Sequence, residues 1–286
     1  MTSRFLFAVL ALSLFCKPIY AGQSTITDAE GNACMGDDKS RKQTEQAALT
    51  DAKKSAVDRA ATYIKSETQV KDFVLQKDII EAYQNATVKV LQEVEKNWYK
   101  DPNSGECYKL KIKAEVIPDE KAIAAMAMKP ETADNPNAPL SVKVWTEKKE
   151  YKAGEQIKVY IKGNKPFYAR VLYKDAGGEM VQLLPNPYRN DNYFNGGAIY
   201  ELPSGNDKFE LAISPPFGEE NVIVYASSQP LGDIEVQGTR GVYAVKTKSK
   251  DVGARTRGVK LMEKSGDKAS VPAEFVETVA AVKTGK

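Results

Sequence analysis

Histidine is absent from this chain of 286 residues. The absence excludes the Ser-His-Asp and Cys-His arrangements of nucleophilic catalysis, general acid–base chemistry by imidazole, and the usual zinc centres. No glycine-rich loop joins an expected strand to an expected helix, so a phosphate cradle has no support either. Paired carboxylates of the glycoside hydrolase kind stay open, because the two groups need only meet in space. The candidates are Glu179, Asp191, Glu201 and Glu210. These four residues lie in expected loops or at exposed strand positions, so we expect no enzyme, no cofactor and no metal site.

The chain also has little excess of either charge, with 41 Lys and Arg residues against 38 Asp and Glu residues. Removing the N-terminal Arg4 and Lys17 leaves 39 basic residues against 38 acidic ones. Such a balance gives no electrostatic footprint for nucleic acid, so we expect no nucleic-acid partner. Lys109, Lys111 and Lys113 alternate along an expected strand, and this spacing predicts one solvated face.

Long apolar runs are confined to the N-terminus. Arg4 precedes the apolar run from Phe5 to Phe15, and Tyr20-Ala21-Gly22 then supplies small residues. This order is typical of a secretory signal peptide, so we predict that residues 1–21 are removed after Ala21 and that the mature chain is exported to the periplasm, the cell surface or the medium. A short N-terminal anchor is the alternative. Cys16 follows Phe15 rather than a small residue, so lipidation is not expected. No other stretch is long and apolar enough to give a stable membrane span after cleavage.

Cysteine is scarce, with three residues in the whole chain. Cys16 lies in the predicted signal peptide, which leaves Cys34 and Cys107. An even pair in an exported chain predicts a disulfide between them, with two buried free thiols as the alternative. A redox role is not expected, because no Cys-x-x-Cys motif is present.

Residues 22–128 predict an α+β domain that contains the disulfide. A strand over 25–35 precedes a long helix that begins at Asp38 or Ser40, a shorter helix over 78–85, and two strands, near 88–99 and 108–116. A last helix is expected over 119–128. The long helix has an apolar face with spacings of three and four, formed by Ala48, Leu49, Ala52, Ala56, Val57, Ala60 and Ile64. Its small side chains predict close packing against a sheet.

Residues 129–139 contain three prolines and are predicted to be a linker. From residue 140 to 286 the apolar period changes to two, which predicts an all-β sandwich of immunoglobulin-like architecture with a C-terminal extension. Asp175 to Gly178 is expected to form a hairpin turn, and Phe209 to Ile213 a short strand. The segment Ala273–Val282 has a helix-like pattern.

Three motifs lie near the N-terminus: Glu30-Gly31, the run from Gln46 to Val57, and the run from Ile64 to Thr68. Together they resemble the N-terminal domain of flagellar assembly protein T, and related small domains occur in other bacterial envelope proteins.

Five motifs follow one another in the second half: Tyr151 to Glu155, Leu183 to Asn186, Pro215 to Gly218, Ala226 to Ser228, and Arg255 to Gly258. They are similar, in order, to the bacterial domain-of-unknown-function family 4384. This resemblance implies an exported or surface-exposed sandwich, and it brings no activity and no catalytic residues. The glycines and prolines of these motifs predict turns and strand ends.

One loop concentrates aromatic and planar polar side chains: Tyr188, Arg189, Asn190, Asp191, Asn192, Tyr193 and Phe194. Such a loop suits sugar stacking or a protein-binding hot spot, and the alternative is a loop that packs its own aromatics onto the sheet. The sequence therefore predicts a non-catalytic module that binds or assembles with an envelope or surface protein. A carbohydrate-binding module, with a glycan as ligand, is the alternative, and an enzyme of unfamiliar type is a third hypothesis.

Overall fold

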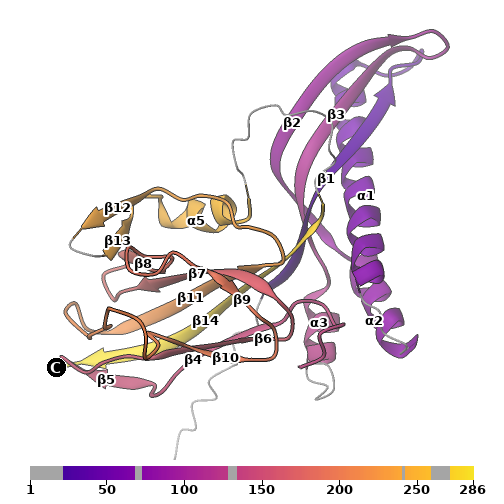
Figure 1. Cartoon of the computed structure of the whole chain (residues 1–286). Helices are drawn as coiled ribbons and strands as arrows, with labels where there is room; N and C mark the ends of the chain where they lie inside the picture. Colours follow the sequence, from indigo (N-terminus) through magenta and orange to yellow (C-terminus); the bar gives the residue numbers. More distant parts are fainter. Residues whose placement is uncertain (1–21, 68–72, 128–133, 240–241, 259–270) are drawn as a thin grey trace, which may run out of the picture.

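The computed structural model describes residues 22–67, 73–127, 134–239, 242–258 and 271–286. The chain is mostly β-structure with a few helices, and its main element is a curled, largely antiparallel sheet of eleven strands (Figure 1). The predicted signal peptide, residues 1–21, lies outside the described residues. Within the described ranges, no helix is both long enough and apolar enough to cross a membrane.

The first half follows the predicted order of elements. These are β1 (Gly22–Cys34), α1 (Arg41–Glu67), α2 (Phe73–Gln84), β2 (Thr87–Asp101), β3 (Gly105–Ile117) and α3 (Glu120–Ala127). Of the two predicted caps, Asp38 and Ser40, it is Ser40 that caps α1: the backbone N–H of Gln43 donates to Ser40 Oγ, and the backbone N–H of Ser40 donates to Gln43 Oε1. This reciprocal pair satisfies two donors that a helix N-terminus otherwise leaves free.

The alanine face of α1 lies directly on β1 and β3. Ala48, Ala52, Ala56 and Ala60 are completely buried, as the spacing predicts. Gly31 of β1 lies opposite them, and a Cβ atom there would come within 2.2 Å of the backbone oxygen of Ala48. The glycine and the alanines together therefore allow the helix backbone to approach the sheet closely.

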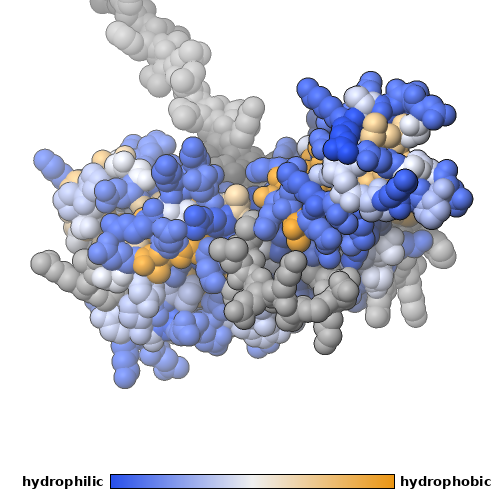
Figure 2. Space-filling view, turned by 90° about the horizontal axis from the view of Figure 1, so that it is seen from above, coloured by the Kyte–Doolittle hydropathy of each residue, from blue (hydrophilic) through white to orange (hydrophobic). Residues whose placement is uncertain are grey.

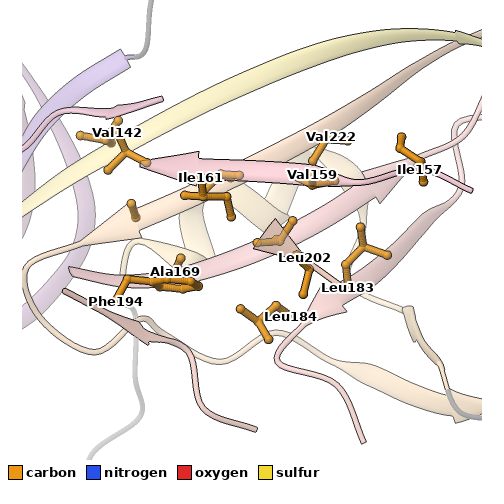
Figure 3. Packing of buried hydrophobic residues seen from close by; sticks show 14 of the residues in the cluster. Val142, Ile157, Val159, Ile161, Ala169, Leu183, Leu184, Phe194, Leu202 and Val222 are labelled. Carbon is orange, nitrogen blue, oxygen red and sulfur yellow. The ribbon is translucent and has the colours of Figure 1, made fainter. Parts of the chain in front are cut away.

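The second half consists of two packed sheets, with one helix on the other face of the large sheet. Its elements are β4 (Val142–Thr146), β5 (Glu150–Lys152), β6 (Val159–Gly163), β7 (Phe167–Lys174), β8 (Met180–Leu184), β9 (Tyr193–Phe194), β10 (Ile199–Leu202), β11 (Glu219–Ser227), β12 (Val236–Thr239), β13 (Val242–Val245), α5 (Ser249–Thr256) and β14 (Ala273–Gly285). Strands β10, β6 and β4 form a separate three-stranded sheet. Its inward side chains, such as Val159 and Ile161, meet those of the large sheet in a common apolar core (Figure 3).

Two predictions for the second half are wrong. The segment with the helix-like pattern is β14, a strand of 13 residues hydrogen-bonded between β1 and β11. Its alanines favour a helix, but its valines and threonines fit a strand, and pairing on both sides decides the outcome. Phe209 to Ile213 forms no regular strand, and it contributes one isolated bridge between Ala212 and Gln156. The predicted hairpin turn at Asp175–Gly178 is confirmed between β7 and β8.

The sheet runs through both halves, because β14 pairs with β1 over Gly22–Ile26 as well as with β11. The described end of the predicted linker is also bound. Asn164 Nδ2 donates to the backbone oxygens of Asn135, Ala138 and Pro139, at 2.8, 3.3 and 3.1 Å. Residues 134–139 are therefore held on the second half, and the boundaries at 128 and 140 stay a prediction.

Candidate functional site

The aromatic residues of the predicted binding loop divide between the core and the surface. Phe194 is buried in β9, where its ring stacks on Phe167 at 5.1 Å. Tyr188 is 55% exposed and Tyr193 is 44% exposed. The ring of Tyr188 stacks on Phe209 at 6.2 Å. Of the three loop aromatics, Tyr188 and Tyr193 are therefore accessible to a ligand, whereas Phe194 is a core residue.

Several polar groups of the same loop are used inside the protein. Asn192 Nδ2 donates to the backbone oxygen of Ala169 at 3.1 Å. Arg189 forms an ion pair with Asp207 at 3.2 Å. Asp191 Oδ1 accepts from the backbone N–H of Tyr193, so it closes its own turn. Asn190 is exposed. These bonds shape the loop, and they leave two tyrosine rings as its main exposed apolar surface.

A second exposed apolar area, which the sequence reasoning missed, covers the outer side of the small sheet. We call it the β4–β6–β10 face, and it consists of Lys143, Trp145, Lys158, Tyr160, Lys162, Ile199 and Glu201. Trp145 pairs directly with Tyr160, and their rings stack at 5.7 Å with 18° between the planes. Ile199 is 60% exposed. The signal was present, because the alternation in 142–146 already places Trp145 opposite to the buried Val142.

Three charged residues of this face form ion pairs. Lys158 Nζ lies 2.6 Å from a carboxylate oxygen of Glu201, and Lys162 Nζ lies 2.7 Å from one of Asp134. The Trp145–Tyr160 pair therefore lies among charged side chains, with Glu201 directly opposite Tyr160 and Lys162 directly opposite Ile199. On the side of the molecule seen in Figure 2, by comparison, apolar residues form only small separate areas among hydrophilic ones.

The carboxylates that stayed open as catalytic candidates engage different partners. Glu201 pairs with Lys158, and Glu210 accepts a hydrogen bond from Gln156 Nε2 at 2.8 Å. Asp191 closes its own turn, and Glu179 lies at the hairpin turn, where its backbone N–H donates to Asp175 Oδ1. In the part of the chain that the structure describes, no three His, Cys, Asp or Glu side chains come together as metal ligands would.

One buried carboxylate stands apart from these surface groups. Glu220 of β11 is 2% exposed and accepts a hydrogen bond from the hydroxyl of Tyr173. Its other oxygen, Oε1, is buried without a hydrogen-bond partner among the described residues. Burial, followed by the hydrogen bond to Glu220, raises the pKa of Tyr173 above its ordinary value. Because a negative charge on Tyr173 would be both buried and next to the Glu220 carboxylate, the Tyr173 hydroxyl is favoured in its neutral form.

The predicted disulfide is present. Cys34 and Cys107 are directly opposite each other on β1 and β3, and their sulfur atoms are bonded at 1.98 Å. The bond lies where the strand pair ends, near the turn between β2 and β3.

Comparison with known proteins gives one match. Residues 150–230 match the family model described as a domain of unknown function, DUF4384. This confirms the predicted resemblance over the range that includes the motifs from Tyr151 to Ser228. The motif Arg255 to Gly258 lies beyond the matched residues, and the likeness of the first half to flagellar assembly protein T stays a prediction. No curated protein and no solved structure matches the chain.

Proposed function

We propose that this chain is an exported, non-catalytic protein of the bacterial envelope or cell surface that binds or assembles with another protein. The observation that carries the proposal is the β4–β6–β10 face. The solvent side of a β-structure is ordinarily polar, but here Trp145 stacks on its cross-strand partner Tyr160, and the exposed Ile199 lies diagonally across from Tyr160 on the next strand. Tryptophan and tyrosine on a protein surface are enriched among protein-binding hot spots.

Two further features support export and an envelope role. The signal-peptide pattern of residues 1–21 and a disulfide between Cys34 and Cys107 both suit an oxidising compartment outside the cytoplasm. We extend the proposal to the architecture as well: the second half is an immunoglobulin-like sandwich, and the first half is related to the N-terminal domain of flagellar assembly protein T. The close contact of Gly31 with α1 gives a physical reason for the glycine in the motif that carries this likeness.

The test is an affinity pull-down of the tagged mature protein from its native envelope after mild crosslinking, with identification by mass spectrometry. We expect Trp145→Ala to lower recovery of the protein partner at least about tenfold, as truncation of a hot-spot residue does. Tyr188→Ala, on the other exposed aromatic area, is the matched control and should keep full recovery. Equal recovery with both variants would show that the partner binds elsewhere, and recovery of glycan or cell-wall material alone would contradict the assembly role.

A carbohydrate-binding function is the second candidate, because the rings of Tyr188 and Tyr193 remain exposed in the loop. Aromatic rings of this kind stack on sugar faces. Glycan arrays probe it directly: Tyr188→Ala and Tyr193→Ala should abolish binding, whereas Trp145→Ala should keep it. Phe194→Ala is unsuitable, because it would open a cavity in the core. Glycan binding that survives both tyrosine substitutions would show that the loop is not the site.

A further inference from the structure

The side chain of Arg257 connects three elements where the two halves meet. Arg257 is the residue directly after α5. Its Nε donates to Glu115 Oε1 of β3 at 2.5 Å, and its Nη2 donates to Glu277 Oε2 of β14 at 2.8 Å. The side chain of Arg257 is 15% exposed and that of Glu115 is 3% exposed. Such a planar fork between two carboxylates favours one geometry over others.

Neighbouring groups hold this cluster in place. Ser24 Oγ of β1 donates to Glu115 Oε1 at 2.8 Å, and the guanidinium of Arg257 lies 4.7 Å from the ring centre of Phe275. Lys113, which the sequence places on a solvated face, instead donates from Nζ to the backbone oxygen of Gly258 at 2.5 Å. The end of α5 is therefore fixed to β3 at two adjacent points.

The electrostatics support a permanent ion-paired state. Burial alone would lower the pKa of Arg257, but the negative charges of Glu115 and Glu277 outweigh burial and raise that pKa. The guanidinium keeps its charge because the two carboxylates compensate it. A cluster of this kind is specific in geometry, and removing one partner leaves the other as a buried unpaired charge.

Among the described residues, the halves also meet through strand pairing, a small apolar cluster, and a side-chain hydrogen bond between Tyr63 of α1 and Ser228. β1 pairs with β14 over five residues, Gly22–Ile26, and Ile26 and Leu91 pack against the cluster that contains Phe275. The twist between paired strands varies over a range of about −10° to −35° among sheets, so strand pairing alone does not set one angle between the halves. The contacts of Arg257 come from the residue that directly follows α5, the helix that lies over the large sheet near β12 and β13 (Figure 1).

We infer that Arg257 is a clasp that fixes the orientation of the first half relative to the second. With the clasp open, the short β1–β14 pairing becomes a hinge, since segments joined by a small interface move relative to each other by default. The clasp therefore holds the disulfide-bonded end of β1 and β3 and the surfaces of the second half in a constant spatial relation. This goes beyond the proposed binding role and does not depend on which face binds the partner.

The experiment measures distances between spin labels attached through non-natural amino acids, so that the disulfide stays intact. One label replaces exposed Asn103 in the turn between β2 and β3, and the other replaces exposed Asn206 in the second half. Arg257→Met removes both ion pairs. Because it leaves Glu115 buried and unpaired, the double variant Arg257→Met/Glu115→Gln and the single variant Glu277→Gln are measured as well. Arg255→Met is the matched control, since Arg255 pairs with Glu235 at the surface.

We expect one narrow distance distribution for the native protein and for Arg255→Met. The Arg257 variants should broaden that distribution about twofold, and Glu277→Gln should broaden it less, because Glu115 still holds the guanidinium. The folded state of each variant is checked by circular dichroism. A folded Arg257→Met/Glu115→Gln variant with the native, narrow distribution would overturn the inference.

Discussion

Gly31 determines how closely α1 approaches the sheet, and its replacement should be among the most damaging changes on the scale of a single residue. A Cβ atom at this position would lie 2.2 Å from both the backbone oxygen of Ala48 and the backbone nitrogen of Ala52. Because those atoms are helix backbone, relief requires the whole helix to move. We expect Gly31→Ala to lower the free energy of unfolding by about 3 kcal/mol, the upper range for overpacking.

Urea unfolding measures this effect, and Gly205→Ala is the control, since a Cβ there meets no atom within 4 Å. Equal stability of the two variants would show that α1 does not lie as close to β1 as the structure places it.

Tyr225 gives the protein a specific sensitivity to alkali. Burial, followed by the charge of Glu277, raises the pKa of Tyr225 from 10.0 to about 12. The neutral phenol is favoured in the folded state, so its contribution to stability is complete below pH 10 and is lost as the pH rises through 12. Between pH 10 and 12, the native protein loses unfolding free energy as Tyr225 titrates, by about 1.4 kcal/mol per pH unit, and Tyr225→Phe should lack this contribution.

The comparison is made by urea unfolding at several pH values between 10 and 12, with Tyr188→Phe as an exposed control. Other buried tyrosines titrate in both proteins, so the difference between variants isolates Tyr225. An unchanged pH slope in Tyr225→Phe would contradict the burial of this hydroxyl.

At the scale of elements, the disulfide connects β1 to β3 across a sequence separation of 73 residues. A link of that length removes conformational freedom from the unfolded chain, and the entropy model gives about 4 kcal/mol of stabilisation. The double variant Cys34→Ser/Cys107→Ser should lose about this amount in urea unfolding without reductant. Reduction of the native protein should cause a comparable loss, whereas the variant should not respond to reductant. A variant as stable as the native protein would show that β1–β3 pairing already restricts the unfolded ensemble.

The sequence predicted those elements whose own pattern agrees with their surroundings. The spacing of alanines defined the buried face of α1, and alternation defined β3. The sequence-based prediction for β14 was wrong, because the alanines of this strand favour a helix and its partners β1 and β11 are distant in the sequence. The structure also shows what local alternation did not predict: register shifts on both sides of Gln92 and Glu93, with Leu91 packed against the second half.

The candidate site was predicted in part for the same reason. The loop from Tyr188 to Phe194 was found by its composition, but the burial of Phe194 follows from its pairing with Phe167, which no local pattern reveals. Trp145, Tyr160 and Ile199 lie on three strands. The Trp145–Tyr160 pair and the diagonal position of Ile199 depend on strand order and register, so the three residues appear unrelated in the sequence.

On the scale of the whole molecule, the folded unit extends beyond the residues that match the family model. The core of the second half includes Leu140 and Val142 before the match and Val276 and Val282 after it. Val276 and Val282 belong to β14, which also pairs with β1 of the first half. One strand therefore belongs to both halves, and neither half has its complete set of contacts without it.

This shared strand predicts that both halves unfold together, and the chain's two tryptophans provide a probe in each half. Trp98 lies on β2 and Trp145 on β4. The fluorescence of Trp145→Phe then reports the first half, and that of Trp98→Phe reports the second. In each variant we expect the fluorescence midpoint in urea to coincide with the midpoint from circular dichroism, as a two-state transition requires. Deletion of residues 271–286 should abolish both transitions, because it removes the strand between β1 and β11. Separate midpoints within one variant, or a Trp98 transition that survives the deletion, would mean that the first half folds independently and that β14 merely attaches to it.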